Sequence, residues 1–423
     1  MGDEKVSGSR GPVLLVIRLL GGRSGGAERL FCETANMLAD LGYEVTALYC
    51  DSSKKAPFYP LSRRVALINL WGGAARGGIA YRALASIAAS ERRFGKELVA
   101  DWLSRNAYFT RRLHQAMIGI RPIVAISFLP PANTPTLLAG AIAHTPVVPT
   151  NHNVPAKDYE SLDRWDPNPL DRWLRLRLLR TAARIHVLFD SFGAWFPAEL
   201  HDRIEVVENY VSDEFFQAYR PSESRSTDSH RVLGVGRLAR VKNFQDMVAA
   251  WGGIASAFPT WRAEILGEGP DAGSLKSQIQ QLGVADSFRL AGAVSDVLSY
   301  YVSSEVLCHP ALHEGFGLSV AEAMACGLPV VAYRDCDGVR EFVREGENGL
   351  MVERRDSSEG IAGALSRLMS DRELRMTLGT RAHASVQRFN RKRYAERWVE
   401  IIESVRRDRD SERRRTRLLG LVR

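Results

Sequence analysis

Runs of apolar residues alternate with amphipathic segments along the first part of the chain. The run "PVLLVIRLL" at 12–20 is typical of a buried strand, and "AERLFCETANMLADLG" at 27–42 repeats apolar residues at the spacing of a helix. Gly42 closes this predicted helix, as glycine often does after a last turn, and "YEVTALYC" at 43–50 is the next predicted strand. The β-α-β order predicts a parallel sheet with helices on its faces.

The stretch between Arg121 and Lys157 carries no formal charge at neutral pH. Its prolines divide it into pieces that are too short to span a bilayer, so we expect no transmembrane helix. We interpret it as a strand at 123–128, a loop, a short helix and a strand at 146–149, with both strands buried in the same parallel sheet. Residues 72–95, rich in Ala, Gly and Arg, are interpreted as an excursion from the fold.

A second alternating series begins near Arg231 and predicts another sheet of the same kind. Its expected strands are "RVLGVG", "WRAEILG", "SFRLAG", "EVLCHP" and "PVVAY". Helices are expected between them, from Asn243, near 274–282 and after Ser319. The two series indicate an α/β protein with two Rossmann-like halves, which would bind ligands in the cleft between them at the carboxyl ends of the strands.

These halves define the expected domains. The first comprises 1–212 and the second 213–391, because the polar stretch 212–230 has the composition of a linker. The last predicted helix, 392–405, carries an apolar stripe that needs a partner surface, and a basic tail, 406–423, follows it.

Composition, charge and cysteine content indicate the class of protein and its compartment. Hydrophobic residues make up 45% and charged residues 25% of the 423 residues, as in ordinary soluble domains. The five cysteines are scattered without metal-type spacing, which suits a reducing compartment. Arg18 interrupts the short first apolar run, which therefore predicts no secretory signal. The tail 406–423 holds eight arginines and three acidic residues, so an anionic surface is its expected partner and a solvated end is the alternative.

The stretch "HEGFGLSVAEAMACGLPVV" follows a predicted strand and carries two glutamates eight positions apart. Glu314 would project from the carboxyl end of that strand. Gly315 and Gly317 allow close backbone approach, and the helix beginning near Ser319 presents free N–H groups to an anion. Glu314 has a solvated loop carboxylate as its alternative. Glu322 forms a Ser-x-x-Glu capping box with Ser319 as its alternative.

The string "VGRLARVKNF" places two cations at another strand-to-helix junction. Arg237 and Lys242 suit a diphosphate, whereas simple surface solvation is the alternative. Because no cluster of metal ligands is seen, these cations and the helix N-termini would neutralise a leaving diphosphate, and we expect no metal cofactor.

The string "GGRSGGAER" follows the first strand and opens the first helix. Gly25 and Gly26 would let the backbone approach a ligand at the helix N-terminus, and a tight turn is the alternative. A dinucleotide site would require G-x-G-x-x-G, which is missing here, although Asp51 ends the second strand as an acid that binds NAD ribose would.

Of the nine histidines, His152 is the best placed for catalysis, because it follows a buried strand; a structural role is the alternative. His309 and His313 have the i, i+4 spacing of metal ligands, but Pro310 denies them a helix. The "DCD" triplet at 335–337 looks like the metal-binding motif of another transferase fold and lies in the wrong context for it.

With these motifs in order, the chain resembles the retaining nucleotide-sugar glycosyltransferases of the large family that includes sucrose synthases and bacterial mannosyltransferases. That family has the GT-B fold, with two Rossmann-like domains facing a deep cleft. The resemblance is most specific in 232–350, through "VGRLARVKNF", "GEGP", "EGFGLSVAEAMACGLPVVA" and "ENGLMV". It implies that Glu314 holds hydroxyls of the donor sugar and Glu322 the ribose diol. The helix 392–405 looks like the one that crosses back onto the first domain.

The resemblance implies further donor contacts. Arg237 and Lys242 would bind the diphosphate, Gly26 would approach the phosphates from the first domain, and His152 matches a position that contacts the donor sugar. The remaining donor-binding positions are Gly25, Gly315, Phe316, Gly317 and Leu318. One departure is the sequence Asp337-Gly338 before Glu341, where the family often has Gly-Gly, so the role of Glu341 is left open.

The expected function is retaining transfer of a hexose or N-acetylhexosamine from a UDP- or GDP-linked sugar. "ISFLPPANTP" and "TNHNVPAKD" resemble, more loosely, first-domain segments of enzymes that build bacterial surface polysaccharides or lipid-linked oligosaccharides. No carboxylate of the N-terminal half stands out as a nucleophile, which favours an internal-return mechanism. An epimerase of the same fold and a non-catalytic sugar-nucleotide or polyanion-binding protein are the alternatives.

The expected acceptor is a saccharide, or one linked to lipid at the inner face of the cytoplasmic membrane. The basic tail would then contact the anionic bilayer from the cytoplasm. Nucleic acid is not expected as a partner, because the tail has no aromatic residue for base stacking.

Overall fold

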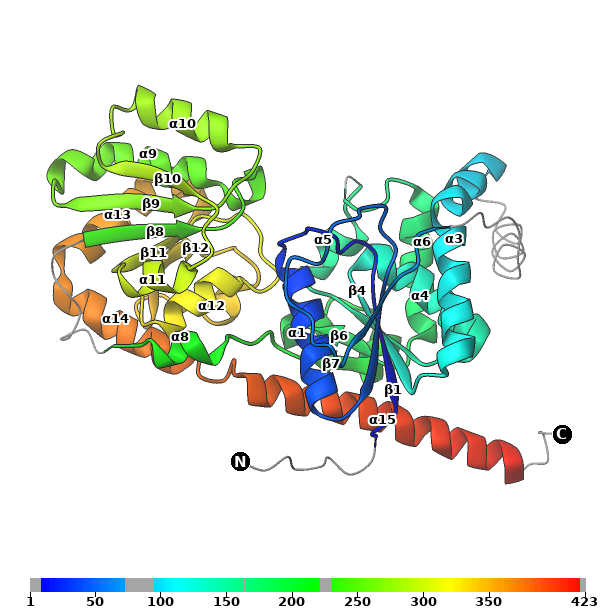
Figure 1. Ribbon diagram of the computed structural model, residues 1–423. Coiled ribbons are helices and arrows are strands. Elements are labelled where there is room, and N and C mark those ends of the chain that lie inside the picture. Colours follow the sequence, from blue (N-terminus) through cyan, green and yellow to red (C-terminus); the bar gives the residue numbers. More distant parts are fainter. Residues whose placement is uncertain (1–8, 73–94, 163, 221–229, 419–423) are drawn as a thin grey trace. The chain divides into compact units, whose positions relative to one another are not determined.

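The computed structural model describes residues 9–72, 95–162, 164–220 and 230–418 (Figure 1). The predicted excursion at 72–95 lies almost wholly outside the described residues. The chain divides into two units, one comprising residues up to Glu208 together with those from Ala395, and the other Asn209–Tyr394. The boundary expected from sequence lies at 212/213.

The first unit is built on a parallel sheet of seven strands in the order β3-β2-β1-β4-β5-β6-β7. The chain leaves β1 toward β2 and later returns to its other side at β4, so the sheet is doubly wound about β1 and β4. The bounds are β1 (Pro12–Ile17), β2 (Glu44–Tyr49), β3 (Ala66–Asn69), β4 (Val124–Phe128), β5 (Val147–Thr150), β6 (Ile185–Val187) and β7 (Ile204–Val206).

Helices cover the sheet of the first unit, and two of them test the sequence interpretation. Gly42 has a φ of +89° and follows the first helix, as predicted. The predicted loop and short helix between the strands at 123–128 and 146–149 are wrong, because a 14-residue helix starts at once with Pro130. The helices are α1 (Gly26–Asp40), α3 (Lys96–Ile120), α4 (Pro130–Ala143), α5 (Pro155–Tyr159), α6 (Pro169–Leu178) and α7 (Asp190–Gly193).

The second unit has a parallel sheet of six strands in the order β10-β9-β8-β11-β12-β13. The predicted linker 212–230 is corrected here, because helix α8 begins at Asp213 and buries Phe215; residues 221–229 lie outside the described residues. The strands are β8 (His230–Val235), β9 (Trp261–Leu266), β10 (Phe288–Gly292), β11 (Val306–His309), β12 (Val330–Tyr333) and β13 (Gly349–Val352). The helices are α8 (Asp213–Gln217), α9 (Phe244–Ile254), α10 (Ala272–Gln281), α11 (Val297–Val302), α12 (Leu318–Ala325), α13 (Ser357–Ser370) and α14 (Arg372–Ser385). The two sheets confirm the predicted α/β architecture with two Rossmann-like units.

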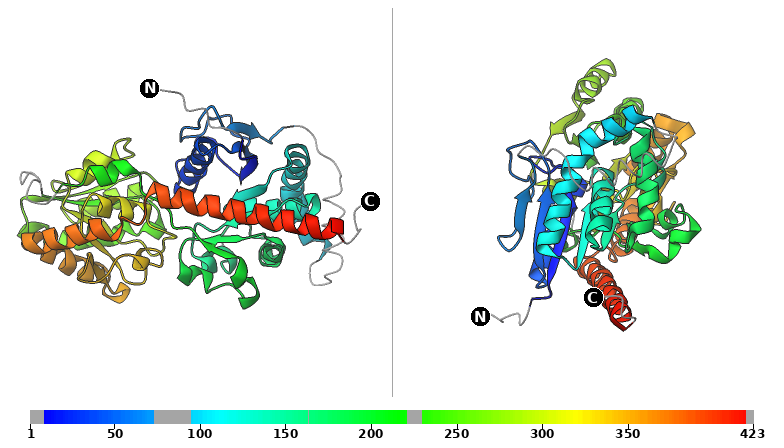
Figure 2. Two further views of the ribbon diagram at one scale, coloured as in Figure 1. Left: turned by 90° about the horizontal axis from the view of Figure 1, so that it is seen from below. Right: turned by 90° about the vertical axis from the view of Figure 1, so that its right-hand side faces the viewer.

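The last helix differs from the prediction of a short helix and a separate tail. Helix α15 (Arg391–Leu418) is continuous, and the predicted apolar stripe is buried against the first unit, with Trp398 fully enclosed. Farther along, Arg406 donates to the carbonyl of Arg10, and Arg409 donates to the carbonyl of Pro122 over 2.8 Å. These carbonyls precede β1 and β4, so α15 runs along the amino ends of the strands (Figures 1 and 2).

No helix among the described residues is long and apolar enough to cross a bilayer.

Candidate functional site

The acidic loop of the second unit leaves the carboxyl end of β11. Lys242, from the loop after β8, forms an ion pair with Oε1 of Glu314, and Nε2 of His309 lies 3.0 Å from the same oxygen. The structure therefore joins Glu314 to Lys242, which the sequence assigned to separate parts of a donor. His309, which sequence analysis considered only as a metal ligand, is the third member of the cluster.

The environment of Glu314 holds it as a carboxylate. Burial alone would raise the pKa of Glu314, but the charge of Lys242 and the adjacent ring of His309 outweigh burial and lower it to about 2. Its side chain is only 14% exposed, so the alternative of a solvated loop carboxylate is wrong.

The cation loop after β8 is locked to its neighbour by backbone contacts. The N–H of Leu238 donates to the carbonyl of Glu268 over 2.9 Å, at the "GEGP" motif. A Cβ atom at Gly267 or Gly269 would overlap backbone atoms of the cation loop, which explains why this motif needs both glycines. Arg237 lies on that loop and is exposed.

The acidic loop ends in the free N-terminus of α12. Gly317 precedes the helix with a φ of +87°, a conformation that favours glycine. The N–H groups of Leu318 and Ser319 open the helix and have no partner within it, whereas those of Val320 and Ala321 donate to the carbonyl of Gly317 over 2.9 and 3.1 Å. Phe316 is buried against Phe342 and Phe389, with ring centroids 5.5 and 4.9 Å away. Its side chain therefore anchors the loop that leads into α12.

Glu322 lies one turn inside α12, and the capping-box alternative for it is wrong. The residue before the helix is Gly317, and Ser319 is already within it. The carboxylate of Glu322 instead accepts a hydrogen bond of 3.3 Å from the hydroxyl of Tyr301. Glu322 is 7% exposed, so its side chain lies in the protein interior.

The "DCD" loop packs on the acidic loop. The N–H of Gly338 donates to the carbonyl of Glu314 over 3.0 Å, and a Cβ atom there would overlap Gly315. Asp335 pairs with Arg354, and Asp337 lies 3.4 Å from Nδ1 of His313. Within the described ranges, no three His, Cys, Asp or Glu side chains gather as metal ligands would.

In the first unit, the glycine loop is held by its neighbours. Asp51 accepts the N–H groups of Leu20 and Gly21 over 3.2 and 3.1 Å, so this carboxylate serves the loop and not a ribose. Gly25 immediately precedes α1, as the sequence predicts for an anion site beside Gly26.

Sequence analysis missed Glu28, whose carboxylate lies where a Cβ atom of Gly25 would be. This acid occupies the amino end of α1, the place that the glycines would offer to a phosphate. A phosphate that binds there has to displace the Glu28 side chain or share the helix end with it.

His152 lies beyond β5 in a row of aromatic rings. Its ring stacks on Phe128, with centroids 5.2 Å apart, and on its other side His186 lies 5.2 Å away. Burial lowers the pKa of His152 well below its ordinary value, so the ring is neutral. Neither ring nitrogen has a hydrogen-bond partner in the described part of the chain, and both are shielded from solvent.

His186 supports this row and was not identified from sequence. The pKa of His186 is lowered to about 4 by burial, so its ring is neutral as well. Nδ1 accepts the N–H of Asn151 over 3.3 Å, and Nε2 donates to the carbonyl of Val207 over 3.0 Å. The row ends on α15, where Trp398 stacks on His186 at 5.4 Å.

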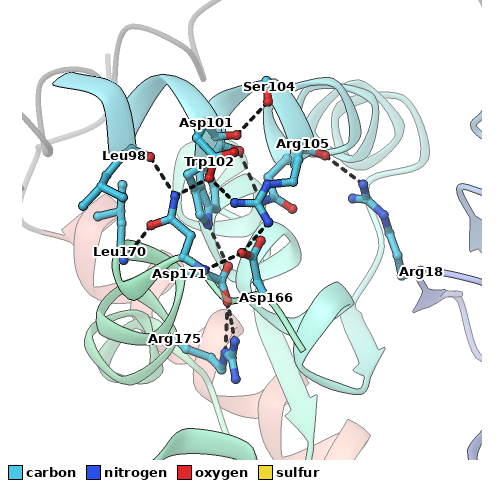
Figure 3. Close-up of polar contacts among 12 residues, drawn as sticks. Arg18, Leu98, Asp101, Trp102, Ser104, Arg105, Asp166, Leu170, Asp171 and Arg175 are labelled. Carbon is cyan, nitrogen blue, oxygen red and sulfur yellow. Dashed lines mark hydrogen bonds and ion pairs between the residues drawn. The ribbon is translucent and has the colours of Figure 1, made fainter. Parts of the chain in front are cut away.

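A buried polar network fixes α6 against α3 in the same unit (Figure 3). Arg175 pairs with Asp171 at 2.5 Å, and the indole of Trp102 donates to the same carboxylate over 2.7 Å. Arg105 joins α3 to Asp166 at 2.6 Å. Sequence patterns did not indicate this network, because its members come from separate elements.

Comparison with known proteins follows this division into two units. The family model "Glycosyltransferase Family 4" matches residues 24–215, and the model "Glycosyl transferases group 1" matches residues 215–385. The lipopolysaccharide core biosynthesis glycosyltransferase LpsE of Rhizobium meliloti is 30% identical over 203 residues, which cover 48% of this chain and 58% of that protein. An uncharacterized glycosyltransferase of Haemophilus influenzae is 31% identical over 175 residues, covering 41% of this chain and 49% of that protein. The matches thus span about half the length of these relatives.

Solved structures share the fold over nearly the whole chain. Sucrose-phosphate synthase from Thermosynechococcus elongatus is 19% identical, covers 94% of this chain and 99% of its own, and has a TM-score of 0.72. Alr3699/HepE of Anabaena, solved in complex with UDP, is 18% identical, covers 93% of this chain and 100% of its own, and has a TM-score of 0.69. With both family models matched in order and the two sheets of that fold in place, the chain belongs to the GT-B glycosyltransferases of the group 1 and family 4 type.

Proposed function

We propose that the protein transfers a hexose or N-acetylhexosamine from a UDP- or GDP-linked sugar to an acceptor, with retention at the anomeric carbon. The observation that carries this proposal is the ion pair of Lys242 and Glu314 at the carboxyl end of β11, beside the free N-terminus of α12. A cation, bare N–H groups and an ionised carboxylate at one sheet edge are the groups that a nucleotide diphosphate sugar needs.

Each side chain of the site then has a role. Lys242 and the exposed Arg237 bind the diphosphate, and the N–H groups at the start of α12 share its charge. Glu314 accepts a hydroxyl of the donor sugar, and Glu322 binds the ribose diol. His152, neutral and without a partner in the described structure, exchanges a hydrogen bond with a hydroxyl of the sugar.

The reaction proceeds by internal return. The bond from C1 of the sugar to the diphosphate oxygen breaks, and the acceptor oxygen attacks C1 from the same face. The proton of the acceptor hydroxyl moves to the departing phosphate oxygen, so no protein nucleophile is needed. Fixed cations stabilise the departing diphosphate without a metal ion.

A donor panel tests this function. The full chain is incubated with UDP- and GDP-linked hexoses and N-acetylhexosamines, with and without saccharide or lipid-linked acceptors, and nucleotide release is followed. Acceptor-dependent release with an α-linked product from an α-linked donor supports the proposal. An epimerised donor without release supports the epimerase, and binding without turnover supports a non-catalytic protein.

We also propose that the acceptor belongs to bacterial surface polysaccharide assembly and that the protein contacts an anionic membrane from the cytoplasm. LpsE is named for lipopolysaccharide core biosynthesis, which supports the first part. For the second part, α15 extends a positively charged sequence along the amino ends of the strands.

Arg406 and Arg409 already bind carbonyls of the first unit, so the basic residues after Glu412 are the better test of membrane contact. Deletion of 413–423 should weaken sedimentation with vesicles rich in anionic lipid while nucleotide binding is unchanged. Equal sedimentation of both proteins at low and high salt would rule the contact out.

A further inference from the structure

The two side chains that approach Glu314 converge on a single oxygen. Lys242 and Nε2 of His309 both contact Oε1. No hydrogen bond from the described residues reaches Oε2 of this carboxylate. Lys242 donates to Oε1, whereas Nε2 of His309 lies within reach of it without a hydrogen bond in the described structure, and Oε2 is left to accept from a ligand.

These donors differ in how firmly they are held. Lys242 comes from a loop, has a flexible four-carbon side chain and is 19% exposed. His309 is the last residue of β11 and is 1% exposed, so its ring is fixed by the strand and the surrounding core. A bound diphosphate competes with Glu314 for the charge of Lys242, whereas it has no means to move His309.

The charged groups around His309 define its protonation. Burial lowers the pKa of His309, the carboxylate of Glu314 raises it, and Lys242 lowers it further, so the ring is neutral. Another titratable neighbour of Glu314 and Lys242 is the Cys336 thiol, which also senses Asp337 and whose pKa burial raises so that it stays protonated. A neutral imidazole has one N–H, and only the tautomer with Nε2–H is able to donate to Glu314.

We propose that His309 is a positioning residue for Glu314: its Nε2–H, which has no hydrogen-bond partner in the described structure, takes over Oε1 when the donor diphosphate draws Lys242 away, so that Oε2 stays aimed at a hydroxyl of the donor sugar. This inference rests on the proposed function. In this proposal, Lys242 pairs first with Glu314 and then with the donor diphosphate, whereas His309 stays beside Glu314 in both states.

The variant His309→Phe keeps a ring and removes the N–H, while His309→Gln puts an amide N–H near the place of Nε2. In the full chain with saturating UDP, His309→Phe should raise the pH at which Glu314 becomes protonated to between about 4 and 7, because a carboxylate without donors returns toward or above its ordinary pKa. The wild type and His309→Gln should keep Glu314 ionised throughout that range. The measurement is the carboxyl-carbon NMR signal of labelled glutamate, assigned by its loss in Glu314→Gln.

Activity gives the second measurement. His309→Phe should lower kcat roughly ten- to a hundred-fold, as loss of a hydrogen bond to a charged group does, with a smaller effect on KM for the donor. His309→Gln should restore most of kcat. It should also return the acid limb of the pH profile of kcat, which His309→Phe shifts to higher pH, toward that of the wild type. The matched control is His230→Phe, because His230 also pairs with a glutamate of the second unit, Nδ1 to Oε1 of Glu305 at 2.6 Å, outside the site.

The outcomes separate this inference from the proposed function. If Glu314 in His309→Phe stays ionised with UDP to the same pH as in the wild type, or if nitrogen NMR shows the Nδ1–H tautomer of His309, the positioning role is refuted whatever the enzyme does. If the NMR results hold and no donor supports nucleotide release, the proposed function fails alone. If His309→Phe does not fold, the comparison of the wild type with His309→Gln decides: a Glu314 signal that titrates differently in these two proteins contradicts the inference.

Discussion

Two ion pairs of this protein have similar chemistry and opposite surroundings. Arg175 and Asp171 in the first unit are 3% and 7% exposed, while Lys242 and Glu314 in the second are 19% and 14% exposed. Both oxygens of Asp171 accept from side chains, one from Trp102 and the other from Arg175. Within the described residues, Lys242 and His309 approach Glu314 at one oxygen only.

The pKa shifts of the two acids follow from this difference. Burial raises the pKa of Asp171, although Arg175 and Trp102 favour its carboxylate. For Glu314, the cation and the imidazole outweigh burial, and its pKa falls to about 2. The enclosed pair thus lies within α6 and is tied to α3 by Trp102, whereas a pair with a free oxygen at a sheet edge is suited to a ligand.

The largest expected difference concerns stability. Arg175→Met leaves Asp171 buried without its cation, so the free energy of unfolding should fall by about 3–5 kcal/mol. Lys242→Met should cost less, about 1–3 kcal/mol, because the pair with Glu314 is less enclosed, while binding of a nucleotide sugar is lost. Urea unfolding and donor titration of both variants measure this contrast. Equal destabilisation would mean that both pairs are structural.

The pH dependence of stability should have opposite signs at the two acids. The folded pKa of Glu314 is depressed, so its contribution is present above its unfolded value near 4.5 and is lost as the pH falls toward about 2. The folded pKa of Asp171 is raised, so its contribution is present below its unfolded value near 3.8 and is lost as the pH rises through the folded pKa.

Glu314→Gln should therefore reduce the loss of stability that occurs as the pH falls. Asp171→Asn should reduce the loss of stability that occurs as the pH rises. Urea unfolding of each variant and the wild type at several pH values between 3 and 7 gives the slopes. Parallel slopes for the two variants would contradict the assigned directions.

The second unit was the more predictable from sequence, and the reason is local. Each of its motifs lies in one stretch of chain, with glycines at backbone contacts that any residue with a Cβ atom would block, as at Gly317 and Gly338. The strands and helices after Arg231 were therefore found close to their observed places. The pairing of Glu314 with Lys242 was not found, because 72 residues separate them and only the sheet brings β8 beside β11.

The first unit was less predictable because its site depends on long-range burial. His186 is an ordinary histidine in sequence, and its role follows from Trp398, which lies on a helix at the other end of the chain. The buried pair of Arg175 and Asp171 has the i, i+4 spacing of many surface pairs, so nothing local marks it as enclosed. The length of the last helix was not predicted, because Arg406 and Arg409 continue it by donating to carbonyls of distant residues, Arg10 and Pro122.

Glu322 gives a smaller test of the same contrast. Glu322→Ala should weaken donor binding roughly tenfold or more, because it removes a buried charged acceptor beside the free helix end. Tyr301→Phe removes the hydroxyl that bonds Glu322 and keeps the carboxylate, so it should weaken binding less. Calorimetric titration with UDP and UDP-sugars measures both. Normal binding by Glu322→Ala with a lowered melting temperature would assign Glu322 to the core alone.

The smallest expected effect is that of a chelator. Lys242, Arg237 and the N–H groups of α12 can take up the charge of a departing diphosphate, and the acids of the "DCD" loop are engaged by Arg354 and His313. Nucleotide release in excess EDTA should therefore equal release in magnesium or manganese, within about twofold. The matched variant is Arg354→Gln, which releases Asp335 and should leave the result unchanged if those acids bind no ion. Activity that is abolished by EDTA and restored by either metal would show that the fixed cations are insufficient. A metal ion, and not Lys242 alone, would then neutralise the diphosphate.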